Sequence, residues 1–294
     1  MIIADKIKDQ DTLFELLKNP EADSFWFVLI DAAFDAKKIS KLTQSFSTSL
    51  YEHSSLEEYA ELSPILVPMS RIIEFGIWPK LLAICNSRPM LSFIKTTKNI
   101  EELKNHFQYV HHAISGHKKW ILRFADTRTI ALLFANLDKK QKELLFKPMQ
   151  SWLWPDRAGN YLMYTNNKTG EIWEKGVAEE LELSDQQFAD FIDQSAPDVL
   201  LRQLSEQFPD LLEKYSPEKS YQLSSIAIKE SKEIGFENNQ NSTLSLAVLW
   251  LICGENLAKQ PEYLELKHKT SNGQTLQQAL SELPSYFFEK SINN

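Results

Sequence analysis

An unbroken run of large apolar residues near the N-terminus constrains the fold of this chain more than any other feature. The segment 24–31 reads Ser-Phe-Trp-Phe-Val-Leu-Ile-Asp and does not alternate between apolar and polar residues. A strand that is apolar on both sides belongs near the centre of a sheet whose two faces are covered. We therefore expect a layered domain built around this strand.

Short strands and amphipathic helices alternate after this run. Further strands are expected at 46–51, 65–67, 90–94 and 120–124. Helices are expected at 70–75, 99–110 and 127–136, and a short helix that Asp11 or Thr12 caps precedes the first strand. The alternation predicts an α/β (α+β) N-terminal lobe with a mixed β-sheet.

The pattern changes in the second half of the chain. A β-hairpin is expected with strands at 161–165 and 171–173, because Asn166–Gly170 supplies residues that tolerate positive φ. From Ser184 onward nearly every segment has helical spacing, and Pro197 is expected at the beginning of a helix. The sequence thus predicts two domains, an α/β lobe at 1–178 and an all-α helical C-terminal lobe at 179–294.

Charge and composition exclude several classes of partner. The formal net charge is −8 and the calculated pI is near 5.4, so nucleic acid and anionic membranes are not expected to bind. The apolar run 244–253 is about half of the ~20 residues that a membrane span needs. The start of the chain shows no secretory signal, and Cys85 and Cys253 lie in apolar stretches typical of reduced thiols. We expect a cytoplasmic protein.

The sequence offers no convincing catalytic or metal-binding pattern. His106, His111, His112 and His117 are close in sequence, but their spacing does not bring four ligands to one metal ion, so we expect partly exposed histidines at a helix end. Neither a nucleophile elbow nor a phosphate- or dinucleotide-binding glycine pattern occurs. We therefore expect no metal, no cofactor and no enzymatic activity.

The segment with the densest charge is Arg123-Phe-Ala-Asp-Thr-Arg128, at a strand-to-helix junction. Asp31, at the end of the first strand, and Asp126 would form a carboxylate pair if they served acid–base chemistry. The structural interpretation is stronger: Asp126 caps the following helix, and Arg123 or Arg128 pairs with a nearby carboxylate. We therefore predict a structural polar junction made of Asp31, Arg123, Asp126 and Arg128.

Aromatic residues crowd the region between the two predicted lobes. Trp152, Trp154 and Trp173 are candidates for binding a protein partner, because Trp is a favoured anchor in interfaces. Packing of the two lobes against each other is the alternative role for the same rings.

Four stretches of the first half resemble the effector chaperones, or adaptors, of bacterial type VI secretion, a family of the Tap and Tec type whose shared domain was formerly of unknown function. These stretches are Phe27–Ala33; Ser49–Glu52 with Leu62–Val67; Leu103–Phe107; and Arg123–Arg128 with the helix that follows. The resemblance implies a cytoplasmic chaperone that binds a toxic protein effector and helps to load it onto the VgrG spike protein.

Two other functions remain open at this stage. An immunity protein that binds a cognate toxin would have a similar acidic composition. A hydrolase with an unrecognised acidic site, built from Asp31, Asp126 and a histidine, is the alternative from a different class.

Overall fold

The structure is a computed structural model that describes residues 4–21, 23–43, 45–166, 181–236 and 239–287. Contacts divide the chain into two compact units, residues 2–191 and residues 192–294. The predicted boundary between residues 178 and 179, and the second strand of the predicted hairpin, lie outside the described residues. Each unit is described by itself below.

A six-stranded sheet with the order β2-β3-β1-β4-β7-β8 forms the centre of the N-terminal unit. All of its strand pairs are antiparallel. The strands are β1 (Phe25–Asp31), β2 (Thr48–Ser49), β3 (Pro64–Pro68), β4 (Leu91–Thr96), β7 (Ser151–Pro155) and β8 (Tyr161–Thr165). A smaller mixed sheet, β6-β5-β9, consists of β5 (His112–Ser115), β6 (Lys118–Ile121) and β9 (Leu181–Glu182).

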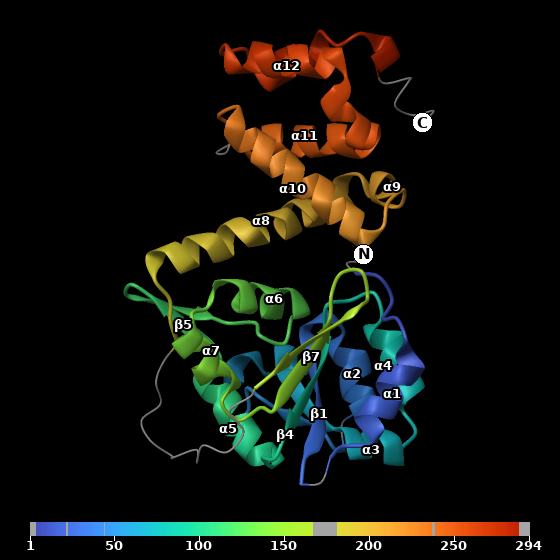
Figure 1. The fold of residues 1–294 in the computed structure, drawn as a ribbon, viewed down its shortest axis with the longest axis vertical. Helices are drawn as coiled ribbons and strands as arrows, with labels where there is room; N and C mark the ends of the chain where they lie inside the picture. The colour runs from blue at the N-terminus through green and yellow to red at the C-terminus, as the bar shows by residue number, and fades with distance from the viewer. Residues whose placement is uncertain (1–3, 22, 44, 167–180, 237–238, 288–294) are drawn as a thin grey trace. The chain divides into compact units, whose positions relative to one another are not determined.

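Helices cover both faces of the large sheet (Figure 1). One face carries α1 (Gln10–Lys18), α2 (Ala36–Thr43), α3 (Met69–Glu74) and α4 (Trp78–Cys85). The other face carries α5 (Ile100–Val110), α6 (Thr127–Asn136) and α7 (Lys139–Phe146). Two short 3₁₀ helices, η1 (Ala32–Phe34) and η2 (Glu57–Leu62), lie in connections between strands.

The burial of β1 explains its unbroken apolar sequence. Phe27 and Leu29 pack into the core beneath α5, α6 and α7, whereas Trp26, Val28 and Ile30 pack into the core beneath α1 to α4. Six of its seven residues are buried, and β1 lies between β3 and β4. The prediction of a central strand covered on both faces is confirmed.

The C-terminal unit is helical. The long helix α8 (Asp185–Gln207) crosses the division between the units. It is followed by α9 (Pro209–Leu212), α10 (Pro217–Glu233), α11 (Gln240–Cys253), η3 (Gly254–Lys259), α12 (Pro261–Ser271) and α13 (Leu276–Ser281). The predicted fold class, an α/β lobe followed by a helical lobe, is confirmed. Among the described residues, no helix combines the length and the apolar character needed to cross a membrane.

The carboxylate of Glu230 joins three helices of the C-terminal unit. Its Oε2 accepts hydrogen bonds from Trp250 Nε1 on α11, at 2.7 Å, and from the hydroxyl of Tyr263 on α12. Its Oε1 accepts from Lys267 Nζ at 3.0 Å. Burial, followed by the bond to this carboxylate, raises the pKa of Tyr263, so the phenol remains a donor. Glu230 thus ties α10 to α11 and α12.

Replacing Glu230 with alanine is expected to lower the free energy of unfolding by about 2–3 kcal/mol, because the buried Trp250 and Tyr263 donors lose their acceptor. Thermal unfolding followed by far-UV circular dichroism measures the change. Glu255, which pairs with Lys219 at the surface of the same unit, provides the matched control. A Glu255→Ala change should leave the unfolding midpoint where it is; equal midpoints for both variants would refute the role of Glu230.

Several local predictions need correction. Asp9, not Asp11 or Thr12, precedes α1, and it makes no side-chain cap. Pro197 lies inside α8 and is itself buried, and Leu200 and Leu204, which follow it in the helix, pack in the core of the C-terminal unit. The strand expected at 120–124 ends at Ile121, and all four residues of β6 are exposed.

Candidate functional site

The carboxylate of Asp31 is the centre of the polar junction at the end of β1. Arg123 donates from its NH2 group to Asp31 Oδ2 at 2.6 Å, and the backbone N–H of Ala33 donates to Oδ1 at 3.2 Å. Asp31 is 2% exposed, whereas the Arg123 side chain is 49% exposed. The buried Asp31 side chain therefore caps the N-terminus of η1 and also pairs with the half-exposed Arg123.

Asp126 performs a similar role at the start of α6. Its Oδ1 accepts from the backbone N–H of Arg128 and from Arg128 Nε, both at 3.0 Å, and Oδ2 accepts from the NH2 group of Arg128 at 2.6 Å. This arrangement combines a helix cap with a two-pronged guanidinium–carboxylate contact. The expectation that Asp126 caps the helix is confirmed.

One aromatic ring connects the two arginines. The guanidinium carbons of Arg123 and Arg128 lie 5.7 and 5.9 Å from the centre of the Phe34 ring, within the range of cation–π attraction. We call Phe34, Arg123 and Arg128 the Phe34 stack. It brings η1 together with the segment before α6, which follows it by some ninety positions in the sequence.

The two buried carboxylates also interact electrostatically. Burial is the main cause that raises the pKa of Asp31, Arg123 opposes the rise, and Asp126 adds to it. The structure thus brings Asp31 and Asp126 into one charged cluster with their two arginines. Burial of a carboxylate without such partners would cost several kcal/mol, so the paired arginines offset the cost of burying these two side chains.

The segment before β4 also contacts the polar junction, through side-chain and backbone hydrogen bonds. Asp35 accepts from Arg88 at 2.9 Å and from Lys38 at 3.0 Å, and these bonds, that of Arg88 first, lower its pKa. The backbone N–H of Thr127 donates to Pro89 O at 2.9 Å. The connection before β4 therefore joins η1 and the start of α6.

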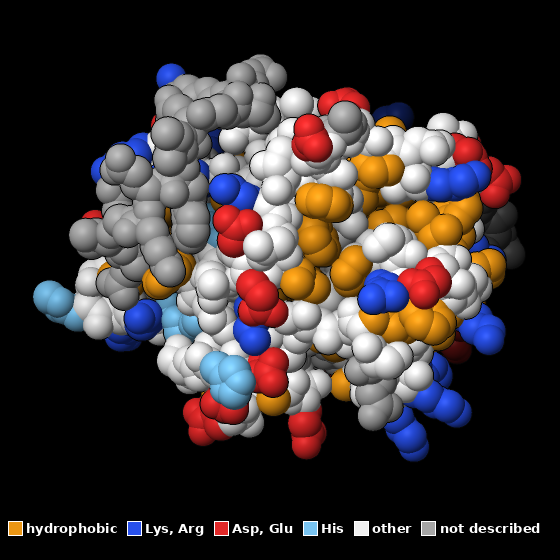
Figure 2. All heavy atoms as spheres, turned by 90° about the horizontal axis from the view of Figure 1, so that it is seen from below, with side chains coloured by type: hydrophobic (Ala, Val, Ile, Leu, Met, Phe, Trp, Pro, Cys, Tyr) orange, Lys and Arg blue, Asp and Glu red, His pale blue; other side chains and the backbone are white. Residues whose placement is uncertain are grey.

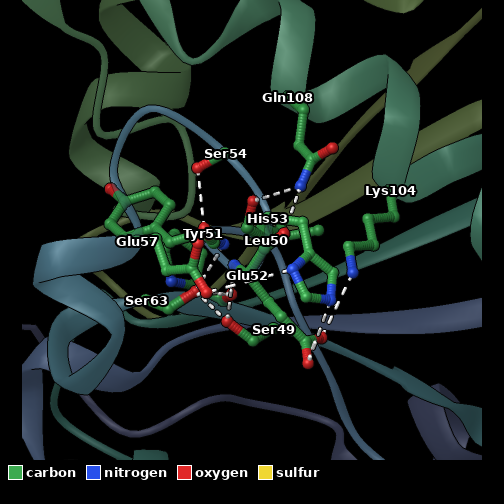
Figure 3. A network of polar contacts seen from close by, with 11 residues as sticks. Ser49, Leu50, Tyr51, Glu52, His53, Ser54, Glu57, Ser63, Lys104 and Gln108 are labelled. Atoms are coloured by element: carbon green, nitrogen blue, oxygen red, sulfur yellow. Dashed lines mark hydrogen bonds and ion pairs between the residues drawn. The ribbon is translucent and has the colours of Figure 1, made fainter.

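A second polar network holds the connection between β2 and β3 against α5 (Figure 3). Gln108 Nε2 donates to the backbone oxygens of Leu50, at 3.2 Å, and Glu52, at 2.7 Å. Lys104 Nζ donates to Glu52 Oε2 at 3.2 Å. Figure 3 shows the side chains of Lys104 and Gln108 reaching from α5 toward this connection. Within the connection, the Ser63 hydroxyl oxygen accepts from the backbone N–H of Tyr51 at 3.0 Å.

Tyr51 links the two networks. Burial raises the pKa of its phenol, and the nearby charge of Asp31 raises it further, while Arg123 acts in the opposite direction. Phe34, Tyr51 and Lys104 were not singled out from the sequence as site residues. Their partners lie far along the chain, so no local spacing could have indicated them.

The predicted tryptophan anchors are internal where the structure describes them. Trp152 is 0% exposed and donates from Nε1 to Ser92 Oγ at 3.0 Å, and Trp154 is 5% exposed. Both lie on β7, within the sheet. A partner could reach these rings only if the sheet opened. Trp173 lies outside the described residues.

The histidines were expected to be partly exposed, which is wrong for His106 and His111. Each is 4% exposed. His106 Nε2 lies 2.8 Å from Leu145 O, and burial lowers its pKa to about 4. His111 lies 3.3 Å from the hydroxyl of Ser55, and burial followed by the charges of His112 and Lys119 lowers its pKa to about 4 as well. Within the described part of the chain, no three His, Cys, Asp or Glu side chains are grouped to hold a metal ion.

Comparison with known proteins gives one match. Residues 26–144 match the family described as "Domain of unknown function (DUF4123)". The matched segment includes Asp31, the Phe34 stack, Asp126 and the whole network of Figure 3. No curated protein and no solved structure matches the chain.

Proposed function

We propose that this chain is a non-enzymatic chaperone, or adaptor, that binds a toxic effector of a type VI secretion system and helps to load it onto the VgrG spike. The match of residues 26–144 to DUF4123 supports the family context, because the sequence stretches that resemble type VI chaperones all fall within it. The proposal places the protein in the cytoplasm of a bacterium, with two protein partners.

The observation that carries the proposal is how those stretches meet. The end of β1, the connection between β2 and β3, helix α5 and the segment 123–128 are joined by Asp31–Arg123, Lys104–Glu52 and Gln108–Leu50 contacts. The charged side chains in these contacts serve to tie separate segments together. Such a use of polar groups favours a rigid body that presents a surface to another polypeptide.

A specific observation keeps a hydrolase as the second candidate. Asp31 and Asp126 are buried in one cluster, and the raised pKa of Asp31 resembles that of a carboxyl group suited to acid–base chemistry. An Asp126→Asn variant separates the two functions, because asparagine still caps α6. Loss of turnover of a small substrate by this variant, with its fold intact, would favour the enzyme.

Deletion of the gene in its native host tests the proposed function. An adaptor-deficient strain should grow normally but fail to kill neighbouring target cells, and the gene supplied in trans should restore killing. A strain that poisons itself after the deletion would instead indicate an immunity protein. A strain that still kills normally would contradict the adaptor function.

A further inference from the structure

The guanidinium of Arg123 has hydrogen-bond donors that are exposed at the surface. A guanidinium carries five N–H donors, and within the described part of the chain Arg123 uses its NH2 group on Asp31. Its side chain is 49% exposed, and one of its faces lies over the Phe34 ring. Asp31 and Phe34 thus fix the orientation of Arg123 and leave part of its fork open to solvent.

The helix beside the Phe34 stack adds apolar and acidic groups. Helix η2 lies alongside η1, and on it Tyr59 is 46% exposed and Leu62 is 51% exposed. Both side chains lie outside the two buried cores of the unit. The same helix also carries the exposed carboxylates Glu57, Glu58 and Glu61.

We propose that Arg123, Phe34 and η2 form the docking surface for the toxic effector, and that this surface takes a segment of the effector with a carboxylate, an apolar side chain and a basic side chain. This inference rests on the proposed function and names the surface that performs it. The carboxylate of this segment binds the solvent-exposed N–H groups of the Arg123 guanidinium. Its apolar side chain packs against Tyr59 and Leu62, and its basic side chain pairs with the η2 glutamates. We call this region the η2 surface.

Charge favours a polypeptide over a nucleic acid on this surface. Three glutamates follow one another closely on η2, and they would repel a chain of phosphates. A segment with both signs of charge meets Arg123 on one side and the glutamates on the other. Arginine and tyrosine are also the residue types that anchor protein interfaces most often.

A second group of exposed apolar side chains serves as the comparison surface. Phe25, at the start of β1, is 52% exposed, and Ile73 and Phe75, at the end of α3, are 37% and 53% exposed. Phe75 stacks on Phe46 with ring centres 5.0 Å apart. Figure 2 shows apolar side chains gathered on the face of the molecule to which these elements belong.

Titration calorimetry of the full chain with a purified toxin of the type VI secretion system of its native host tests the η2 surface. Arg123→Gln and Leu62→Ser are each expected to weaken binding about tenfold or more. Leu62 is half exposed, so Leu62→Ser tests the surface without disturbing the buried Asp31 pair. Circular dichroism of each variant confirms that it is folded.

Matched controls come from α3 and the residue that follows it. Arg71 is an exposed arginine that donates to Glu74 at 2.7 Å, and Phe75 is as exposed as Leu62. Arg71→Gln and Phe75→Ser should bind the toxin within about twofold of the unmodified chain. The inference is overturned if the toxin binds but only the control variants weaken it, or if none does. If the unmodified chain itself does not bind the toxin, the proposed function fails, and the inference fails with it.

Discussion

Replacing Trp152 with alanine is expected to lower the free energy of unfolding of the N-terminal unit by about 3–5 kcal/mol. The side chain is 0% exposed, and its ring lies 5.9 Å from the ring of Phe107 and 5.5 Å from that of Phe146. The variant also leaves the buried Ser92 hydroxyl without its indole donor. Urea unfolding followed by far-UV circular dichroism measures the loss.

Met163 on the neighbouring strand β8 is the matched control for Trp152. It is 59% exposed, so Met163→Ala should change the free energy of unfolding by no more than about 0.5 kcal/mol. The internal position of Trp152 would be disproved if Trp152→Ala left stability unchanged and instead weakened binding of a protein partner. That outcome is the one expected of an exposed interface anchor.

Acid is expected to destabilise the N-terminal unit through His106. In the folded protein this imidazole stays neutral down to its lowered pKa of about 4, whereas in the unfolded chain it takes up a proton near pH 6.5. The unfolded state therefore binds more protons between these values. The stabilising contribution is complete above about pH 6.5 and falls by about 2–3 kcal/mol as the pH drops to about 4.5.

A histidine variant isolates this effect from the other titrating groups. His106→Gln retains a donor for Leu145 O but cannot titrate, so its urea midpoint should fall less between about pH 7.5 and about pH 4.5 than that of the unmodified chain. Met163, which is exposed and cannot titrate, is the control, and Met163→Ala should keep the pH dependence of the unmodified chain. The raised pKa of Asp31 acts in the opposite direction, and the comparison between variants removes its contribution. Identical pH profiles for His106→Gln and the unmodified chain would refute the assignment.

Local sequence patterns predicted the helices and strands whose conformation depends mainly on residues close to them in the sequence. Helix α6 was expected at 127–136 and occupies Thr127–Asn136, because Asp126 caps it and its apolar residues share one face. Strand β1 was expected because an apolar run without alternation fits only a covered strand. The helical nature of the second half followed from its spacing and its proline and glycine positions.

The remaining features depend on contacts between distant segments. The Phe34 stack joins residues that only the folded sheet brings together, so neither Phe34 nor its role could be read from local spacing. His106 and His111 were placed at the surface because helix periodicity alone does not show that α5 packs on the sheet with α7 beside it.

The tryptophans of β7 were predicted as partner anchors although the sequence around them has the pattern of a buried strand. The segment Ser-Trp-Leu-Trp-Pro at 151–155 has the same lack of alternation as β1, and all five residues are buried between β4 and β8. The pattern that identified β1 therefore also indicates a core strand here. The prediction of a partner-binding role relied instead on the frequency of tryptophan in protein interfaces.

Co-purification from the native host tests the central claim, that this chain holds other proteins and delivers one of them. The full chain, tagged at one terminus and expressed at its natural level, should recover both a toxic effector and a VgrG spike protein. Recovery of neither protein would contradict the proposed function.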